Sequence, residues 1–238
     1  MPRTIIELEH VALRFCDREF PSATTIVLGG SASTGRRTPT SDIDLLLIAP
    51  PAAFDGQGGD ATSVARVTHF DGERIDVFAY TVEGFTDWSE RDFASLRPVL
   101  PILLTEGTPL RTGDEFDTLR GWAADRLERG PQVDDHARAL RRYAITDLLD
   151  DLGDATDPLI IAALRSELFR GLAELSILAA GAWLGSGKWL ARRLRAADPT
   201  AADALERFAS ELDPRAAAAL ASQLLERLGG RVDGDFVR

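Results

Sequence analysis

Two aspartates separated by one residue open an apolar stretch, and their types and spacing indicate metal chemistry. Asp42 and Asp44 begin the run Asp-Ile-Asp-Leu-Leu-Leu-Ile, which is typical of a buried β-strand. Side chains two residues apart on a strand point to the same face, so the two carboxylates repel each other unless a cation neutralises them. Mg²⁺ suits this pair, because it commonly binds one or two carboxylates together with substrate phosphates.

A Gly-Ser pair lies upstream of these acids and indicates phosphate binding. Ten residues separate Gly30-Ser31 from Asp42. The pair follows a short β-branched run at Thr24–Leu28 and begins a predicted helix, so its free N–H groups and positive helix end form a potential anion site. A metal site beside a phosphate site is what phosphoryl or nucleotidyl transfer requires.

Asp76 is the candidate for a third acid. It lies between Ile75 and Val77 in the predicted strand Arg74–Tyr80, where a carboxylate needs a partner. Three converging acids would permit a site for two metal ions, and Asp76 could also act as the general base. The alternative is that Asp76 faces solvent on an edge strand.

The elements that must position these residues divide at Gly130-Pro131. The first part is predicted as mixed α/β, and Asp71-Gly72 joins two of its strands as a hairpin. The second part is predicted as an antiparallel helical bundle with short connections. The expected elements before the boundary are a helix at Thr4–Asp17, strands at Thr24–Leu28, Asp42–Ile48, Val64–Phe70, Arg74–Tyr80 and Thr108–Arg111, and helices at Val82–Phe93, Arg97–Thr105 and Asp114–Arg129. The expected bundle helices are 134–152, 157–181, 186–196, 199–212 and 214–228.

The order Gly-Ser, ten residues, Asp-x-Asp and a further strand acid resembles the polymerase-β-type nucleotidyltransferase superfamily. Within it, the chain is most similar to bacterial streptomycin/spectinomycin adenylyltransferases, through Gly30-Ser31-Ala32 and Ser41–Leu46. The resemblance covers nearly the full chain. It implies an α+β fold, with a nucleotidyltransferase domain of mixed sheet and flanking helices at 1–130 and an α-helical bundle at 131–238 that closes onto nucleotide and substrate.

The resemblance also implies roles for individual residues. Asp42 and Asp44 bind Mg²⁺, and Asp76 is the third acid, as metal ligand, general base or both. The nucleotide-binding set that it implies is Gly30, Ser31, Ser41 and Lys188.

Lys188 is the only lysine in the chain. In such families a basic residue of the helical domain often closes onto the phosphates. Ser186 is predicted as the N-cap of its helix, and Lys188, Arg192 and Arg195 recur at i, i+4 and i+7 on one helix face. The alternative is a solvated cationic face.

Two further acids are candidates for the general base. Glu167 and Glu174 share one face of a bundle helix that is otherwise rich in apolar residues. A carboxylate in such surroundings could accept a proton from the bundle side. Ion pairs with Arg165 or Arg170 are the alternative explanation.

Composition excludes several classes of protein. One cysteine and three histidines exclude a disulfide scaffold and a Cys/His zinc site. The N-terminus lacks the apolar region of a signal peptide, and there is no uncharged apolar run of about 18 residues. We therefore expect a soluble, cytoplasmic protein. The net charge of −11 disfavours a nucleic-acid partner.

These features predict Mg²⁺-dependent transfer of AMP from ATP to a hydroxyl of a small acceptor, with release of pyrophosphate. An aminoglycoside antibiotic is favoured as acceptor, because an acidic protein attracts cations. One alternative is nucleotidylation of a protein or tRNA, as in toxin–antitoxin pairs. Another is a non-catalytic nucleotide-sensing module, which the cost of unneutralised acids disfavours. The sequence does not specify the acceptor or the oligomeric state.

Overall fold

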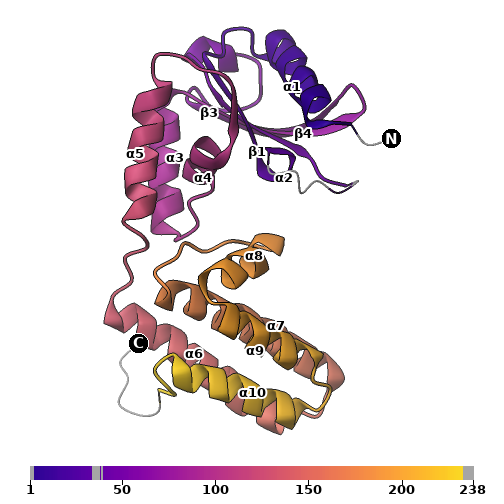
Figure 1. The fold of residues 1–238 in the computed structure, drawn as a ribbon, viewed down its shortest axis with the longest axis vertical. Coiled ribbons are helices and arrows are strands. Elements are labelled where there is room, and N and C mark those ends of the chain that lie inside the picture. Colours follow the sequence, from indigo (N-terminus) through magenta and orange to yellow (C-terminus); the bar gives the residue numbers. More distant parts are fainter. Residues whose placement is uncertain (1–2, 34–37, 39, 233–238) are drawn as a thin grey trace. The chain divides into compact units, whose positions relative to one another are not determined.

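The chain forms two compact units, Met1–Arg129 and Gly130–Arg238. The computed structural model describes residues 3–33, 38 and 40–232 (Figure 1). In the part described, the first unit contains a five-stranded sheet in the order β3-β4-β2-β1-β5. Its strands are β1 (Thr25–Gly29), β2 (Ile43–Ile48), β3 (Ser63–Phe70), β4 (Glu73–Tyr80) and β5 (Thr108–Arg111). β2 and β4 are parallel, and the other neighbouring strands are antiparallel.

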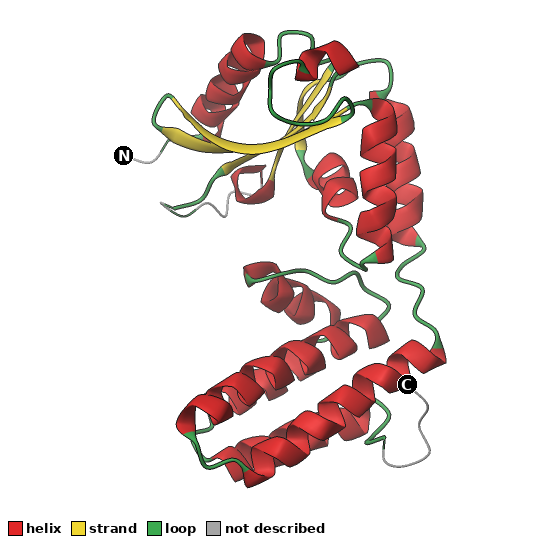
Figure 2. Cartoon of the chain, turned by 180° about the vertical axis from the view of Figure 1, so that it is seen from behind, coloured by secondary structure: helices red, strands yellow, loops and turns green. Residues whose placement is uncertain are grey.

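Helices cover both faces of this sheet, which explains why its central strands are almost wholly apolar. The helices are α1 (Ile5–Glu19), α2 (Gly30–Ser33), α3 (Val82–Ala94), α4 (Val99–Glu106) and α5 (Phe116–Glu128), with a short 3₁₀ turn at Pro51–Phe54. Alternate residues of β1 enter two cores: Ile26 packs with the buried face of α1, and Val27 packs with α3, α4 and α5. Figure 2 shows these two helical layers from behind.

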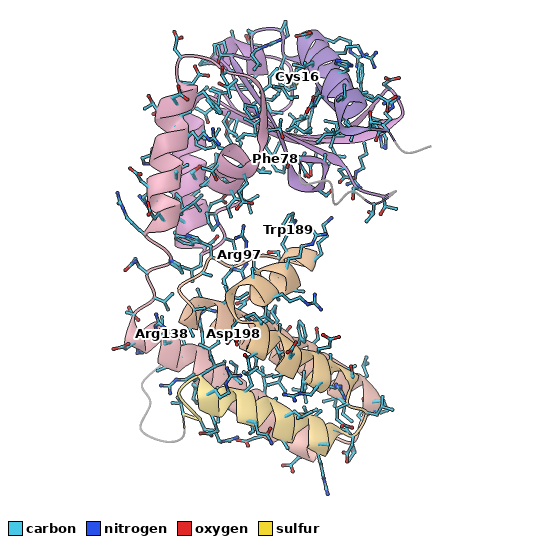
Figure 3. All side chains as sticks on the ribbon, in the orientation of Figure 1. Cys16, Phe78, Arg97, Arg138, Trp189 and Asp198 are labelled. Carbon is cyan, nitrogen blue, oxygen red and sulfur yellow. The ribbon has the colours of Figure 1, made fainter. Side chains whose placement is uncertain are left out.

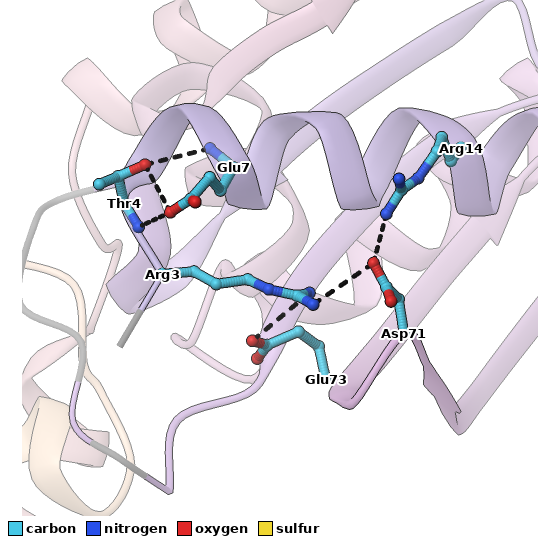
Figure 4. Close-up of polar contacts among 6 residues, drawn as sticks. All are labelled: Arg3, Thr4, Glu7, Arg14, Asp71 and Glu73. Carbon is cyan, nitrogen blue, oxygen red and sulfur yellow. Dashed lines mark hydrogen bonds and ion pairs between the residues drawn. The ribbon is translucent and has the colours of Figure 1, made fainter. Parts of the chain in front are cut away.

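A network of charged side chains fastens α1 to the β3–β4 hairpin (Figure 4). Thr4 and Glu7 form a capping box that begins α1. Arg3 lies 3.4 Å from the carboxylate of Asp71 and 3.7 Å from that of Glu73, and Arg14 also pairs with Asp71. Residues from three separate elements thus hold the hairpin turn against the helix.

The second unit consists of helices in its described part. They are α6 (Asp135–Asp154), α7 (Pro158–Ala179), α8 (Lys188–Ala197), α9 (Pro199–Ser210) and α10 (Pro214–Arg227). Three of them begin with an Asp-Pro pair, in which the aspartate caps the first N–H groups and proline occupies the first helical position. The predicted fold class, a mixed sheet with flanking helices followed by a helical bundle, is therefore confirmed. No helix in the described ranges is long and apolar enough to cross a membrane.

Candidate active site

Asp44 and Asp76 are direct neighbours in the sheet. They are in register in the parallel pairing of β2 with β4, and paired residues of adjacent strands share a face. Phe78 lies two residues further along β4 and therefore on the same face as Asp76. It packs against the core formed with α3, α4 and α5, and Figure 3 shows it on the opposite side of the sheet from Cys16. The acids thus lie on the face of the sheet that α3, α4 and α5 cover. β4 lies between β3 and β2, so Asp76 is not on an edge strand.

The two carboxylates lie where the helical cover of the sheet ends. Asp44 and Asp76 are both half-buried, whereas Leu46 and Tyr80, further along the same strands and on the same face, are buried. The acids therefore occupy the N-terminal ends of two parallel strands, beside the core rather than within it. A ligand can reach the carboxylates there without opening the core.

Asp42 adds a second negative charge close to Asp76. Its carboxylate lies 3.6 Å from Nε of Arg74. Burial raises the pKa of Asp76, and the charge of Asp42 raises it further, while the positive charge of Arg74 opposes both effects. Asp76 is thus a more basic carboxylate than an ordinary aspartate.

Gly30 lies against the carboxylate of Asp44, although it comes well before Asp44 in the sequence. Its φ is +64°, a conformation that residues with a Cβ rarely adopt. A Cβ placed on Gly30 would overlap Oδ2 of Asp44 and lie 2.7 Å from its Cγ. The glycine of the Gly-Ser pair is therefore required both by its backbone and by the carboxylate beside it.

The two predicted serines lie between β1 and β2, in the part of the chain that leads to these acids. Ser31 is buried in α2, which is a single turn, so the helix dipole there is small and phosphate binding would depend on individual N–H and hydroxyl groups. Ser41 is also buried. Its hydroxyl accepts a hydrogen bond of 2.9 Å from the backbone N–H of Thr38, and its own N–H donates to the Thr38 carbonyl at 3.0 Å.

The carboxylates of Asp42 and Asp44 are suited to binding a hard divalent cation. Asp42 and Asp44 offer carboxylate oxygens, the ligands that Mg²⁺ prefers. Within residues 3–33, 38 and 40–232, however, no three histidine, cysteine or carboxylate side chains converge closely enough to hold a metal ion by themselves. Phosphate oxygens of a bound nucleotide would have to complete the coordination. The three-acid metal set with Asp76 stays a prediction.

In the helical unit, α8 carries the predicted cationic face. Lys188 is its first residue and is exposed. The guanidinium of Arg192 lies 4.7 Å from the ring centroid of Trp189, and its Nη1 is buried with no hydrogen-bond partner among the described residues. Arg195 is exposed and lies 3.8 Å from the carboxylate of Glu206.

The prediction that Ser186 caps α8 is wrong. The N-cap is Gly187, which has φ +54° and makes no side-chain cap. The carbonyl of Ser186 instead accepts a hydrogen bond from Trp189 N–H at 2.9 Å. The chain therefore enters α8 through a tight turn whose left-handed residue is glycine.

The two alternative bases of the bundle are both in ion pairs. Glu167 is exposed and pairs with Arg170. Glu174 is buried, and its carboxylate lies 3.3 Å from Nη1 of Arg141 on α6. Arg165 pairs with neither acid, because it donates to the carbonyls of Phe208 and Ala209 at the end of α9.

Arg74 is the charged neighbour of the acids that sequence reasoning missed. It lies two residues before Asp76 on β4 and therefore on the same face. That spacing was the available signal. Its pairing with Asp42, however, depends on β2 and β4 being neighbours.

Comparison with known proteins identifies the domain that holds these acids. Residues 11–103 match the family model of the nucleotidyltransferase domain. No curated relative matches the sequence. Among solved structures, a nucleotidyltransferase-like protein from Exiguobacterium sibiricum is similar at 15% identity and a TM-score of 0.47, over 93% of this chain and 74% of that chain. Residues 11–103 of the first unit thus contain a nucleotidyltransferase domain, as predicted.

Proposed function

We propose that the chain transfers AMP from ATP to a hydroxyl group of a small cationic acceptor, such as an aminoglycoside antibiotic, with Mg²⁺ as cofactor and pyrophosphate as the second product. The observation that carries the proposal is the register of Asp44 with Asp76, next to Gly30, inside a nucleotidyltransferase domain. It supports the proposal because it brings two carboxylates and the Gly-Ser turn together, the groups that metal binding, proton transfer and phosphate binding would need.

In the proposed reaction, Asp76 takes the proton of the acceptor hydroxyl. The acceptor oxygen then forms a bond to the α-phosphorus of ATP. The bond from that phosphorus to the oxygen that bridges to the β-phosphate breaks, and pyrophosphate leaves with the electron pair. The raised pKa of Asp76, caused by burial and by Asp42, makes the carboxylate a better proton acceptor at neutral pH.

The remaining residues of the first unit hold the donor. Asp42 and Asp44 would bind Mg²⁺, which when bound neutralises charge on the triphosphate and the leaving pyrophosphate. Gly30, Ser31 and Ser41 would line the triphosphate with N–H and hydroxyl groups. The short α2 leaves little dipole for this task, so we assign it to direct hydrogen bonds.

We assign nucleotide and metal binding to residues 1–130, and closure onto the nucleotide and the substrate to residues 131–238. Lys188 would contact the triphosphate from α8. Arg192 and Arg195 follow Lys188 on the same helix, and their positive charge favours an anion there. The net charge of −11 favours a cationic acceptor.

Pyrophosphate release with ATP and Mg²⁺ tests the proposal, using streptomycin, spectinomycin and the neutral cyclitol myo-inositol as acceptors. We expect release with an aminated acceptor and its loss in Asp44→Ala. Asp76→Asn should lower the rate by about a hundredfold or more, the contribution of a general base. Asp87→Ala, which removes an exposed carboxylate of α3, is the matched control and should retain activity.

Two results would overturn the proposal. Full activity in Asp44→Ala would show that the acid pair is not the metal site. Absence of AMP transfer to any of the three acceptors, with an AMP adduct on host protein or RNA by mass spectrometry, would move the function to macromolecular nucleotidylation.

A further inference from the structure

One row of residues crosses four strands of the sheet at the level of the acids. The strand pairings place Gly29 beside Asp44, Asp44 beside Asp76, and Asp76 beside Val67 of β3. The row therefore runs from the Gly-Ser turn, through both acids, to the outermost strand of the sheet. Gly29 and Val67, at the two ends of this row, therefore lie on opposite sides of Asp44 and Asp76.

Val67 is exposed at the β3 end of this row. Directly paired residues of antiparallel strands share a face, so Val67 lies on the same face as Asp76. Its relative exposure is 50%, and its same-face neighbours on β3, Ala65 and His69, are exposed as well. The intervening residues Arg66 and Thr68 are half-buried on the other face. In the described chain, an apolar side chain thus lies uncovered beside the basic carboxylate.

We infer that Val67 contacts the acceptor and that β3 forms the acceptor side of the site; this inference rests on the proposed function. The donor triphosphate is assigned to the Gly30 end of the row. In phosphoryl transfer the attacking and leaving oxygens lie roughly in line on opposite sides of the phosphorus. The acceptor oxygen therefore approaches from the Val67 end.

The reach of the carboxylate makes this contact necessary. The acceptor hydroxyl must come within about 2.6–3.2 Å of Asp76 to give up its proton. The Cβ atoms of directly paired residues are about 4.5–5.5 Å apart, so the carbon framework that bears the hydroxyl covers Val67. The matching acceptor has a face of C–H groups next to the reacting hydroxyl, as a cyclitol or sugar ring has.

The charges on this face define where the acceptor's amines point. Arg74 pairs with His69 across the strands, one pair further along the same face. The positive charge of Arg74 therefore directs the positively charged groups of an acceptor away from that end of β3 and β4. Adding a cation at Val67 should repel such an acceptor more strongly than adding an anion.

Steady-state kinetics of Val67→Lys and Val67→Glu test the inference, with streptomycin and spectinomycin as acceptors. We expect the KM for the acceptor to rise by about tenfold or more, which is the scale of a lost apolar contact, and to rise further in Val67→Lys. The KM for ATP should change by less than about twofold, because the contact is on the acceptor side. Val67→Ile should keep the wild-type values.

Val82→Lys is the matched control. Val82 is also an exposed valine of the first unit, with 45% relative exposure, but it begins α3 at the far ends of β2 and β4. An unchanged KM for the acceptor in Val67→Lys, or an equal rise in the KM for ATP, would overturn the inference while leaving AMP transfer intact. Failure of the wild-type chain to release pyrophosphate would instead overturn the proposed function, and the inference with it.

Discussion

Replacing Gly30 with alanine tests whether the Gly-Ser turn and the acid pair form one site. Alanine there carries two penalties. The left-handed backbone costs about 1–2 kcal/mol, and the new Cβ overlaps the carboxylate of Asp44 and must displace it. Because a displacement of about 1 Å lowers a catalytic rate about a hundredfold, we expect pyrophosphate release to fall by about that factor.

Gly72→Ala separates the two penalties. Gly72, in the β3–β4 turn, has φ +79°, and a Cβ there meets no atom within 4 Å. Gly72→Ala is therefore destabilised only by the left-handed conformation of its backbone. We expect it to lose stability by about 1–2 kcal/mol and to retain activity, whereas Gly30→Ala loses both.

A double-mutant cycle measures the contact with Asp44 directly. In an Asp44→Ala background, the nearest remaining atom to the new Cβ of Gly30→Ala is Cβ of residue 44, at 3.3 Å. The destabilisation caused by Gly30→Ala should then be smaller by about 0.5–3 kcal/mol, the usual coupling between residues in contact, as measured by urea denaturation of the metal-free protein. An equal cost in both backgrounds, or activity in Gly30→Ala equal to that of Gly72→Ala, would refute the reasoning.

Three further substitutions test the charges. Burial and the neighbouring carboxylate of Asp42 raise the pKa of Asp76, so the charged form of Asp76 destabilises the folded state. Asp76→Asn should therefore raise the Tm of the metal-free protein at pH 7. This gain in Tm should vanish below pH 3.8, the ordinary pKa of an aspartate, where Asp76 is protonated in both states. Glu174→Gln leaves Arg141 without its partner and should cost about 1–2 kcal/mol in urea denaturation, less than for a fully buried pair because the arginine is partly exposed. The rate of pyrophosphate release by Glu174→Gln should equal that of the wild type. A large loss of this rate would indicate that Glu174 is the general base. Burial acts to raise the pKa of Glu115, but the hydroxyl groups of Thr24 and Thr25 donate to its carboxylate and lower the pKa overall. Thr25→Val removes one of these hydrogen bonds and should lower the free energy of unfolding by about 1 kcal/mol at pH 7. This loss should shrink as the pH falls below 4.5, because Glu115 becomes protonated. Denaturation curves at pH 7 and pH 3 check this sign, and a cost that grows with acid would contradict it.

Local signals in the sequence predicted most of the helices and strands of the fold. Alternation and apolar runs predicted the strands around Asp44 and Asp76, because side-chain direction in a strand repeats every two residues. Asp-Pro pairs marked three helix starts in the second unit, because aspartate caps the free N–H groups and proline fits the first turn. Such signals depend on neighbouring residues and need no knowledge of the tertiary structure.

Local signals failed where two conformations compete within a few residues. Ser186 has the side chain of a good N-cap, yet the chain begins α8 after Gly187. The glycine adopts a left-handed conformation that permits the turn, and the turn then moves the start of the helix. Capping preference alone does not predict which of the two adjacent residues prevails.

The sequence by itself determined the chemistry available to this protein: an acid pair, a further strand acid and a Gly-Ser turn, at spacings suited to metal and phosphate. Only the tertiary structure decided which groups meet. The parallel pairing of β2 with β4 places Asp44 beside Asp76, and the path of β1 places Gly30 against the Asp44 carboxylate. The same sheet order places Val67 beside Asp76. Strand order and register arise from packing of the whole sheet against its helices, and they relate residues far apart in the chain.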